Sequence, residues 1–478
     1  MTFSRFADKI DGLHYLAEKM ELSGSRVRRY LMKTPFCTKA EVLESHFDIL
    51  QKAFDILETP GTGPVVMQLK HLFTTVHDIS GTLEDLKQHR VLDEIALFEI
   101  KYFASLCRDF RLLCEKLDFT SQAPDCLQPV FDLLDPDSTG TAGFYIYDSY
   151  SKSLAYARKK AAATDPDKDL ALWGRATDRV LQEELLVRKE LSAKLSRMYD
   201  VLQSNFDRLA YLELWFAKAE LAGKYGMVRP VIVPATGTGT EVFSVDGMVN
   251  PVIADILAAD GMTFQPVSLM LQQGPCLLTG ANMSGKTVVL KTLALVQALT
   301  QFSFFIPARK AVIPLVKDVF LVIGDKQDHY RGLSSYAAEM LELDKIMGIV
   351  KEGADVLVLA DEPARTTNPA EGAAILCALI AFLQQYNVRS LVSTHYGELD
   401  VSVRKLRVAG FEGGKATGRL DPASVSKYMN YSLIEDKDDA VPKEALLIAQ
   451  LLGVDASFIQ MAQNFLKKNG NERIQTGA

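Results

Sequence analysis

The sequence lacks several features by which whole classes of proteins are recognised. None of its six cysteines, at positions 37, 107, 114, 126, 276 and 377, forms a Cys-x-x-Cys pair, so neither a zinc motif nor a disulfide framework is indicated. The longest apolar runs are too short to span a bilayer, and the first ten residues form no apolar signal core. We therefore expect a cytoplasmic protein with reduced cysteines and no membrane association.

Excess positive charge is also missing. The 478 residues contain 53 Lys plus Arg and 60 Asp plus Glu, which gives a formal net charge of −7. The chain therefore does not carry the bulk charge with which proteins coat nucleic acids, although a local basic face is compatible with this balance. Hydrophobic residues make up 48% of the chain and charged residues 24%, an ordinary globular mixture that rules out wholesale disorder.

The apolar pattern changes near residue 225 and predicts two unlike domains. Residues 1–225 show helical periodicity almost throughout, for example in an apolar stripe from Leu43 to Leu57. From residue 226 onward, short β-rich runs alternate with helical segments, and several runs are apolar on both faces, as buried parallel strands are. The runs expected to be strands are Val231–Val233, Cys276–Thr279, Val319–Ile323, Val356–Ala360 and Ser390–Ser393.

Two further elements are expected in the first half. An apolar stripe from Leu191 to Phe216 keeps its phase, which predicts one long helix over about residues 178–222, extending ~60 Å at 1.5 Å per residue. Such a helix either packs in a helical bundle, which we favour, or projects as an arm. The turn-rich segment 135–143 predicts a break between helices, and Phe144–Tyr147, directly after it, predicts a short strand.

The strongest signal in the sequence is a glycine-rich loop between a predicted strand and a predicted helix. It matches the pattern G-x-x-x-x-G-K-[ST] without a gap, and its residues are Gly280, Ala281, Asn282, Met283, Ser284, Gly285, Lys286 and Thr287. In such a loop, backbone N–H groups point at phosphate oxygens, and the following helix adds its positive N-terminal end. We expect Lys286 to bind the β- and γ-phosphates of ATP, and the Thr287 hydroxyl to ligate Mg²⁺.

A pair of acidic residues at the end of another predicted strand supplies the second half of a nucleotide site. Asp361 and Glu362 end an apolar, strand-like run; we expect Asp361 to hold Mg²⁺ and Glu362 to orient and polarise the attacking water. Asn368 and Pro369 then mark the start of a new helix. His395 ends the next strand and is interpreted as a sensor of the γ-phosphate.

These segments resemble the MutS family of ABC-type ATPases, and the resemblance covers the whole second half of the chain. The segments similar to family motifs are Leu277–Thr287, Phe305–Ala308, Gly332–Met340, Asp361–Gly372, Ser393–Leu399 and Glu444–Val454. The resemblance implies an α-helical core and lever domain, residues 1–225, followed by an α/β P-loop ATPase domain of the ABC type, residues 226–478, with a C-terminal helical segment. It also implies an enzyme that hydrolyses ATP with Mg²⁺.

The resemblance further implies a composite site in a dimer. MutS-type ATPases pair two ATPase domains head to tail, so Ser334 would act in trans on the γ-phosphate bound by the partner subunit, which is a second copy or another MutS-like subunit. Phe264 precedes the glycine-rich loop at a spacing similar to that of the family's adenine-stacking aromatic residue. In the first half, Ser23–Pro35 is similar to an entry helix of the core domain, and we interpret its arginines as a solvated helix face.

Two features of some family members are missing. Repair-type MutS proteins read mismatches with a Phe-x-Glu wedge, but none of the 24 phenylalanines here is followed two residues later by Glu. The chain also stops at Ala478, without the small nuclease domain that other members carry after the ATPase. We therefore expect a chain that begins directly at the core helices.

Three functions remain open. The first is an ATP-dependent MutS-like clamp, a DNA-binding ATPase of the mismatch-repair type without its own mismatch-reading domain. The alternative is a protein-remodelling ATPase, because short MutS-related proteins encoded near lysine-degradation enzymes are thought to reactivate cobalamin-dependent enzymes such as lysine aminomutase. The net charge of −7 mildly favours this protein client. A nucleotide-gated scaffold with little turnover is disfavoured by the intact Asp361, Glu362 and His395.

Overall fold

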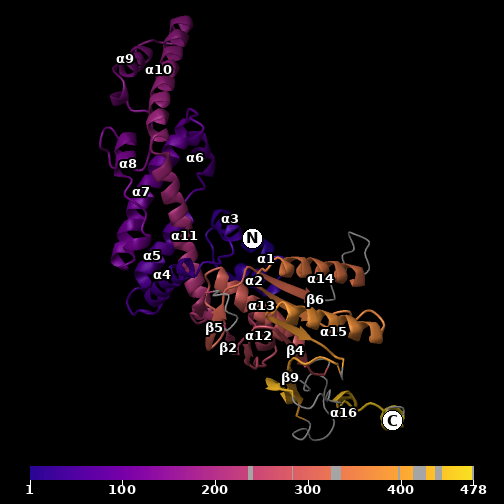
Figure 1. Cartoon of the computed structure of the whole chain (residues 1–478). Coiled ribbons are helices and arrows are strands. Elements are labelled where there is room, and N and C mark those ends of the chain that lie inside the picture. The colour runs from indigo at the N-terminus through magenta and orange to yellow at the C-terminus, as the bar shows by residue number, and fades with distance from the viewer. Residues whose placement is uncertain are drawn as a thin grey trace. The chain divides into compact units, whose positions relative to one another are not determined.

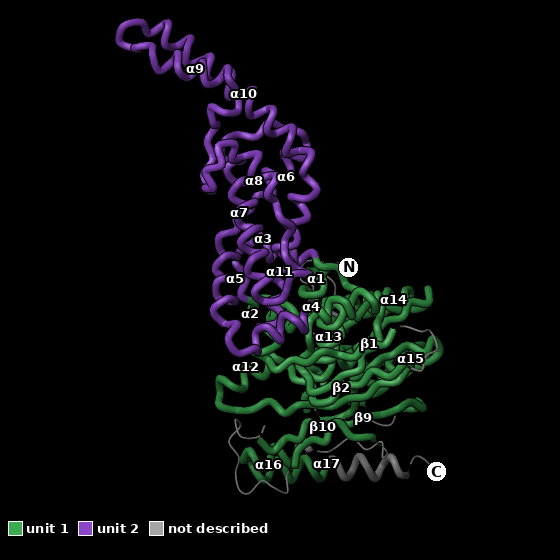
Figure 2. Tube along the Cα trace, turned by 90° about the vertical axis from the view of Figure 1, so that its left-hand side faces the viewer, with its two compact units in different colours: residues 1–20, 34–48, 221–478 green, residues 21–33, 49–220 purple. Residues whose placement is uncertain are grey.

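The chain forms two compact units, shown in green and purple in Figure 2. The computed structural model describes residues 1–234, 241–281, 284–323, 335–396, 399–412, 427–436 and 444–475. Unit 1 consists of residues 1–20, 34–48 and 221–478, and unit 2 of residues 21–33 and 49–220. The units are therefore not the two consecutive segments, divided near residue 225, that the sequence pattern suggested.

Unit 2 is helical throughout its described residues. Its helices are α3 (Ser25–Lys33), α5 (Gly63–Thr75), α6 (Ser80–Lys87), α7 (Glu94–Lys116), α8 (Gln128–Leu134), α9 (Lys152–Ala162) and α10 (Leu170–Ser196), with 3₁₀ turns at Thr120–Gln122 and Asp148–Tyr150. Two more helices, α4 (Ala40–Glu58) and α11 (Tyr199–Lys224), begin in one unit and end in the other along the chain. The stripe from Leu43 to Leu57 indeed lies on one helix, and Leu43, Phe47 and Leu50 are fully buried.

The prediction of a single helix over residues 178–222 is wrong, because the structure has two helices, α10 and α11, separated at Arg197 and Met198. At the break the hydrogen bonds span three residues instead of four: Arg197 N–H donates to Lys194 O at 3.2 Å and Met198 N–H donates to Leu195 O at 2.8 Å. The apolar stripe nevertheless continues across the break, so periodicity predicted the buried face correctly and could not detect the local change in hydrogen bonding.

The segment after the predicted break is held by a buried lysine and forms no strand. Lys101, on α7, is fully buried and donates to Asp135 Oδ1 at 3.0 Å, to Gly143 O at 2.8 Å and to Tyr147 Oη at 3.2 Å. Burial alone would raise the pKa of Asp135, but hydrogen bonds from Thr139, Gly140 and Lys101 hold it well below its ordinary value. The predicted strand at residues 144–147 is therefore wrong. This segment is irregular, and the Lys101 ammonium group holds it through hydrogen bonds at Gly143 and Tyr147.

The sequence predicts that the arginines of α3 lie on a solvated helix face, and this prediction is wrong for one of them. Arg28 and Arg29 are exposed, but Arg26 is buried. Its guanidinium lies 5.0 Å from the centroid of the Phe206 ring and 3.9 Å from Glu213 Oε2. A partner carboxylate and an aromatic face make this burial tolerable, and neither could be seen in the local sequence.

The described residues of unit 1 form two sheets. The six-stranded sheet has the order β10-β9-β4-β8-β7-β6, in which β10 is antiparallel to β9 and the other pairs are parallel. Its strands are β4 (Pro275–Thr279), β6 (Asp318–Ile323), β7 (Val356–Asp361), β8 (Ser390–Ser393), β9 (Arg404–Phe411) and β10 (Met429–Glu435). The four-stranded sheet has the order β1-β5-β2-β3 and consists of β1 (Val231–Val233), β2 (Phe243–Met248), β3 (Val267–Leu271) and β5 (Lys310–Pro314).

Helices cover both faces of the six-stranded sheet (Figure 1). The helices of unit 1 are α1 (Phe3–Ala7), α2 (Asp11–Lys19), α12 (Pro251–Ala259), α13 (Lys286–Gln301), α14 (Ser335–Lys351), α15 (Pro369–Gln385), α16 (Glu444–Leu451) and α17 (Ala456–Gln475). Val356 and Val358 of β7 share one core with apolar residues of α14 and α15. Leu357 and Leu359 point to the opposite face, because side chains alternate along a strand, and α13 packs there.

Residues near the N-terminus complete the cover of α13, which explains why unit 1 includes them. The Phe302 ring, directly after α13, packs edge-on against Phe3 and Phe6 of α1 at centroid distances of 5.1 and 5.3 Å. Gln301 Nε2 donates to Cys37 O at 2.9 Å. α13 is buried on nearly every side, including at Thr292, Gln297 and Thr300, and the first segment of the chain covers one of these sides.

We predict that Phe302→Ala destabilises unit 1 by about 3–5 kcal/mol, because the cavity left between α13 and α1 cannot collapse fully. The matched control is Ile256→Ala on α12, whose side chain is 55% exposed and whose truncation should change stability by less than about 0.5 kcal/mol. Thermal unfolding of both variants, followed by calorimetry, checks this. Equal melting temperatures for the two variants would contradict the packing described.

Candidate nucleotide-binding site

The glycine-rich loop lies where the sequence predicted, between β4 and α13. Gly285 is the N-cap residue of α13 and has φ +88°, a left-handed conformation that favours glycine. A Cβ atom at this position would also meet the Tyr431 ring at 3.1 Å. The N-terminus of a 16-residue helix therefore opens directly onto the loop, which is the local geometry that binds phosphate.

Lys286 is buried at the base of this loop. Its ammonium group donates to Gly280 O at 2.9 Å and to Ala281 O at 3.2 Å, and it lies 3.3 Å from Glu362 Oε1. The side chain is thus folded back beneath the loop with its charge directed at the end of β7. A phosphate oxygen entering the loop would compete with Glu362 for this charge.

Asp361 links three elements at the carboxyl ends of the parallel strands. Thr287 Oγ1 of α13 donates to Asp361 Oδ2 at 2.6 Å, and Ser393 Oγ of β8 donates to Asp361 Oδ1 at 2.5 Å. The Glu362 N–H in turn donates to Ser393 Oγ at 3.0 Å. Ligands bind outside the carboxyl ends of the strands in open α/β sheets, and that is where these oxygens gather.

Glu362 is a partly buried carboxylate with cationic neighbours. Besides Lys286, Arg365 Nη1 lies 3.5 Å and His395 Nδ1 lies 3.4 Å from Glu362 Oε2. His395 Nδ1 is buried and makes no hydrogen bond in the described structure. A carboxylate at the mouth of the loop, flanked by an imidazole, can orient a water molecule or accept its proton.

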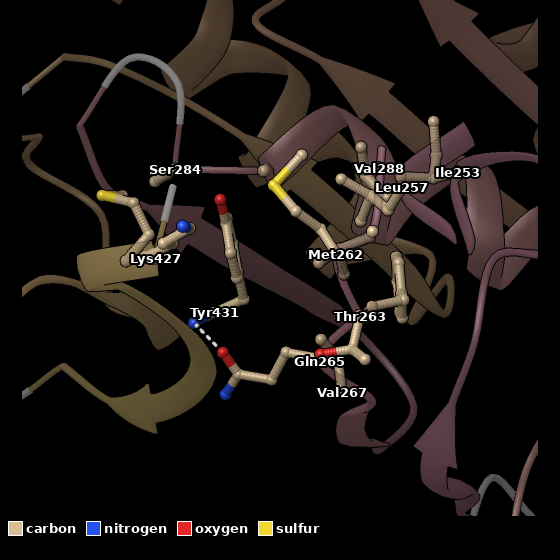
Figure 3. Close-up of a pocket in the computed structure, with 15 residues that line it drawn as sticks. Ile253, Leu257, Met262, Thr263, Gln265, Val267, Ser284, Val288, Lys427 and Tyr431 are labelled. Carbon is tan, nitrogen blue, oxygen red and sulfur yellow. Dashed lines mark hydrogen bonds between the residues drawn. The ribbon is translucent and has the colours of Figure 1, made fainter. Parts of the chain in front are cut away.

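A cavity of about 600 Å³ opens beside the loop, between α12 and β10 (Figure 3). Figure 3 shows the Tyr431 ring on one side of the cavity and the apolar side chains of Leu257 and Val288 on the other. The backbone N–H of Tyr431 donates to Gln265 Oε1 at 3.0 Å, and burial raises the pKa of the Tyr431 hydroxyl. A mostly apolar cavity beside the glycine-rich loop suits a heteroaromatic base.

The structure brings most of the predicted site residues together. Gly280, Ala281, Ser284, Gly285, Lys286 and Thr287 form the loop and the start of α13; Asp361, Glu362 and His395 stand beside it; and Phe264 lines the cavity. Asn282, Met283 and Ser334 lie outside the described residues. The helix start at Asn368 and Pro369 is confirmed, since Asn368 Oδ1 accepts from the Ala370 N–H at 2.9 Å.

Sequence reasoning missed Tyr431 and Ser393 as site residues. Tyr431 lies on β10, which was not predicted as a strand, about 150 positions after the loop that it faces. The sequence indicated Ser393 only as the end of a predicted strand and the start of a family-like segment, with no role in the site. Its position two residues before His395, at the end of a buried strand, was the one available signal, because the ends of parallel strands meet at one edge of a sheet.

The oxygen atoms at this edge fit a magnesium ion. Mg²⁺ binds oxygen ligands, usually one or two from the protein together with waters and phosphate oxygens. The Thr287 hydroxyl and the Asp361 carboxylate, already 2.6 Å apart, provide this pair. Within the described ranges, no cluster of three or more His, Cys, Asp or Glu residues could hold a metal by itself, so any ion here would need such additional ligands.

No described helix combines the length and the apolar character required to cross a bilayer.

Comparison with known proteins finds a family match in the second half of the chain. Residues 276–468 match the model of MutS domain V. This range includes the glycine-rich loop, the end of β7 and His395, as well as Tyr431. The family match therefore covers nearly all of the site described above, but not α12 or Phe264.

Curated relatives match a longer part of the chain. A DNA mismatch repair protein MutS of Rhodopseudomonas palustris (strain BisB18) is 32% identical over 306 residues, which cover 61% of this chain and 32% of that protein. Another, of Bradyrhizobium sp. (strain ORS 278), is 34% identical over 239 residues, covering 48% and 25%. An Endonuclease MutS2 of Agathobacter rectalis is 30% identical over 294 residues, covering 60% and 34%. The matched part of the chain spans at most about a third of these relatives.

We predict that Gly285→Ala lowers the affinity for a fluorescent ATP analogue ~5- to 30-fold. A left-handed alanine costs about 1–2 kcal/mol, which the loop relieves by leaving its binding conformation, and 1.4 kcal/mol corresponds to tenfold. Contact with the Tyr431 ring at 3.1 Å adds to this cost. Fluorescence titration measures the effect.

The matched control is Gly348→Ala on α14, where a Cβ meets no atom within 4 Å. It should leave affinity unchanged and slightly stabilise the helix. Unaltered affinity in Gly285→Ala would remove this loop from the nucleotide site.

Proposed function

We propose that this chain, which is similar to proteins of the MutS family, is an ATP-dependent MutS-like clamp that binds and hydrolyses ATP with Mg²⁺. One observation carries the proposal. The loop lysine, the Thr287–Asp361 pair and Glu362 converge at the N-terminus of α13. A structural role alone gives no reason to gather a lysine and two carboxylates around a helix N-terminus.

In the proposed reaction each side chain has a distinct task. The loop amides and Lys286 hold the phosphate chain, while Thr287 and Asp361 hold Mg²⁺, which neutralises charge developing on the phosphate oxygens. Glu362 orients the attacking water and accepts its proton. His395, 3.4 Å from the Glu362 carboxylate, contacts the γ-phosphate and so reports its presence. Phe264 and Tyr431 enclose the adenine base in the cavity of Figure 3.

The active form in this proposal is a dimer, either of two copies or with another MutS-like subunit. The family resemblance assigns to Ser334 a hydrogen bond to the γ-phosphate held by the partner subunit. ATP then closes the dimer and hydrolysis releases it, which is a two-state device biased by the γ-phosphate.

DNA is the first candidate for what the clamp holds. Relatives are named as DNA mismatch repair proteins, and the hairpin of α9 and α10 has a charge that differs from the chain as a whole. Between Lys152 and Arg197 there are eleven Lys or Arg against seven Asp or Glu, an excess of four positive charges (11 − 7 = +4) in a chain of net charge −7. A local basic excess of this kind favours contact with phosphate backbones.

A protein client is the second candidate, and a different property of the same hairpin favours it. Tyr156, Leu181 and Leu186 are 70%, 57% and 56% exposed. Binding to a DNA backbone requires no such apolar side chains, whereas protein interfaces are built around them. In this version the ATPase remodels a protein, such as a cobalamin-dependent lysine aminomutase.

We predict that Glu362→Gln still binds ATP with near-normal affinity but hydrolyses it at least ~100-fold more slowly, as expected for the loss of a general base. Phosphate release and analogue titration measure the two properties separately. The control is Glu352→Gln, an exposed glutamate just after α14, which should hydrolyse ATP at the normal rate. If Glu362→Gln turns over normally, Glu362 is not the base.

The two candidates for the clamped partner predict different salt dependence. If DNA is held, duplex or branched DNA should stimulate hydrolysis, and its affinity should fall ~10³-fold or more between ~50 and ~200 mM salt. The double charge reversal Lys159→Glu/Lys160→Glu should weaken binding, and the uncharged substitution Leu181→Ser/Leu186→Ser should not. Fluorescence anisotropy with labelled DNA measures both effects. No DNA binding at ~50 mM salt would sink the DNA version and leave the protein client.

A further inference from the structure

The turn that follows β7 is held in a conformation that its residues do not favour. Glu362 has φ +47° and Ala364 has φ +61°, and the left-handed conformation is unfavourable for residues other than glycine. Such strain persists only where neighbouring groups over-determine the backbone. The turn carries the proposed general base, so the groups that hold it also set the position of Glu362.

One of these groups is a carboxylate of α14. Glu339 is 7% exposed, and its Oε1 accepts a hydrogen bond from the Ala364 N–H at 3.0 Å. Burial raises the pKa of Glu339, while the Ala364 N–H opposes this rise. Leu343 and Ile346 of the same helix pack in the core beside β7. Burying a carboxylate costs more free energy than burying an apolar side chain of similar size. The hydrogen bond from the Ala364 N–H gives a reason for a carboxylate at this position.

The turn is fixed from two other directions as well. The Glu362 N–H donates to Ser393 O at 3.2 Å and to Ser393 Oγ at 3.0 Å, which ties the turn to β8. On α15, a Cβ added to Gly372 would lie 2.2 Å from Tyr396 Oη and 3.0 Å from Ala364 O. The Tyr396 hydroxyl and the Ala364 carbonyl therefore fill the space that this glycine leaves open.

We propose that Glu339 is a positioning residue for Glu362, which it holds in place through the backbone N–H of Ala364. This inference rests on the proposed ATP hydrolysis and adds to it a residue outside the nucleotide-binding groups.

Three variants test the proposal. Glu339→Leu removes the acceptor and should lower kcat ~10–100-fold, since a misplacement of about 1 Å can cost 10²-fold, while analogue affinity changes less than ~2-fold. Glu339→Gln keeps an oxygen acceptor and should retain most of the activity. In Glu339→Leu/Ala364→Gly, the glycine adopts the left-handed conformation without help, so part of the lost kcat should return.

A measurement without nucleotide separates this inference from the proposed function. Hydrogen exchange of the peptide spanning residues 360–368 should be faster in Glu339→Leu than in the wild-type chain, and unchanged in Glu339→Gln. If the wild-type chain does not hydrolyse ATP, the proposed function fails, but the exchange result still tests whether Glu339 holds the turn.

If the wild-type chain is active and Glu339→Leu keeps its kcat, the positioning role of Glu339 is overturned. Equal losses in Glu339→Leu and Glu339→Gln would overturn it too, because that pattern would require the charge and not the hydrogen bond. If the Leu variant unfolds, the folded Glu339→Gln variant decides the question: normal kcat with unchanged exchange of residues 360–368 supports the hydrogen-bonding role, and a large loss of kcat overturns it.

Discussion

The carboxylate of Asp361 is the point on which the geometry of the site depends. Each of its oxygens accepts a hydrogen bond from a hydroxyl of a different element, Thr287 of α13 and Ser393 of β8. These bonds join the start of α13 to the ends of two parallel strands, so the positions of the loop, of Glu362 and of His395 depend on one another. Charge-assisted bonds of this kind are stronger than neutral ones, and they lie over a core of fully buried strand residues.

Backbone strain near Asp361 lies in the turn after β7 and not in the strands. The strands beneath it are apolar on both faces and need no polar support, whereas the turn above it contains two left-handed non-glycine residues. Polar contacts from α14 and β8, together with close packing on α15, compensate for this turn. The candidate residues thus lie on a loop and a turn supported by a well-packed sheet, which is the usual arrangement of functional residues.

The sequence allowed prediction of elements whose signal is local. The glycine-rich loop, five of the strands and the capped start of α15 were all predicted from residue type and spacing. What escaped prediction depends on partners distant in sequence. Arg26 is buried because Phe206 and Glu213 meet it, and Tyr431 reaches the cavity from a partly exposed edge strand without an apolar run. The break between α10 and α11 left the apolar period intact, so no pattern of side chains could show it.

The cover that the N-terminal segment provides for α13 has a consequence for synthesis. Cys37 meets Gln301 across 264 residues of chain, and at ~5–20 residues per second a ribosome needs roughly 13–50 s to make them. During that interval Phe3 and Phe6 lack their partner Phe302, while residues 49–220 can already fold. Unit 1 is therefore the last part to assemble, and the early segment must avoid aggregation while it waits. A chaperone that binds apolar N-terminal segments would act in that interval.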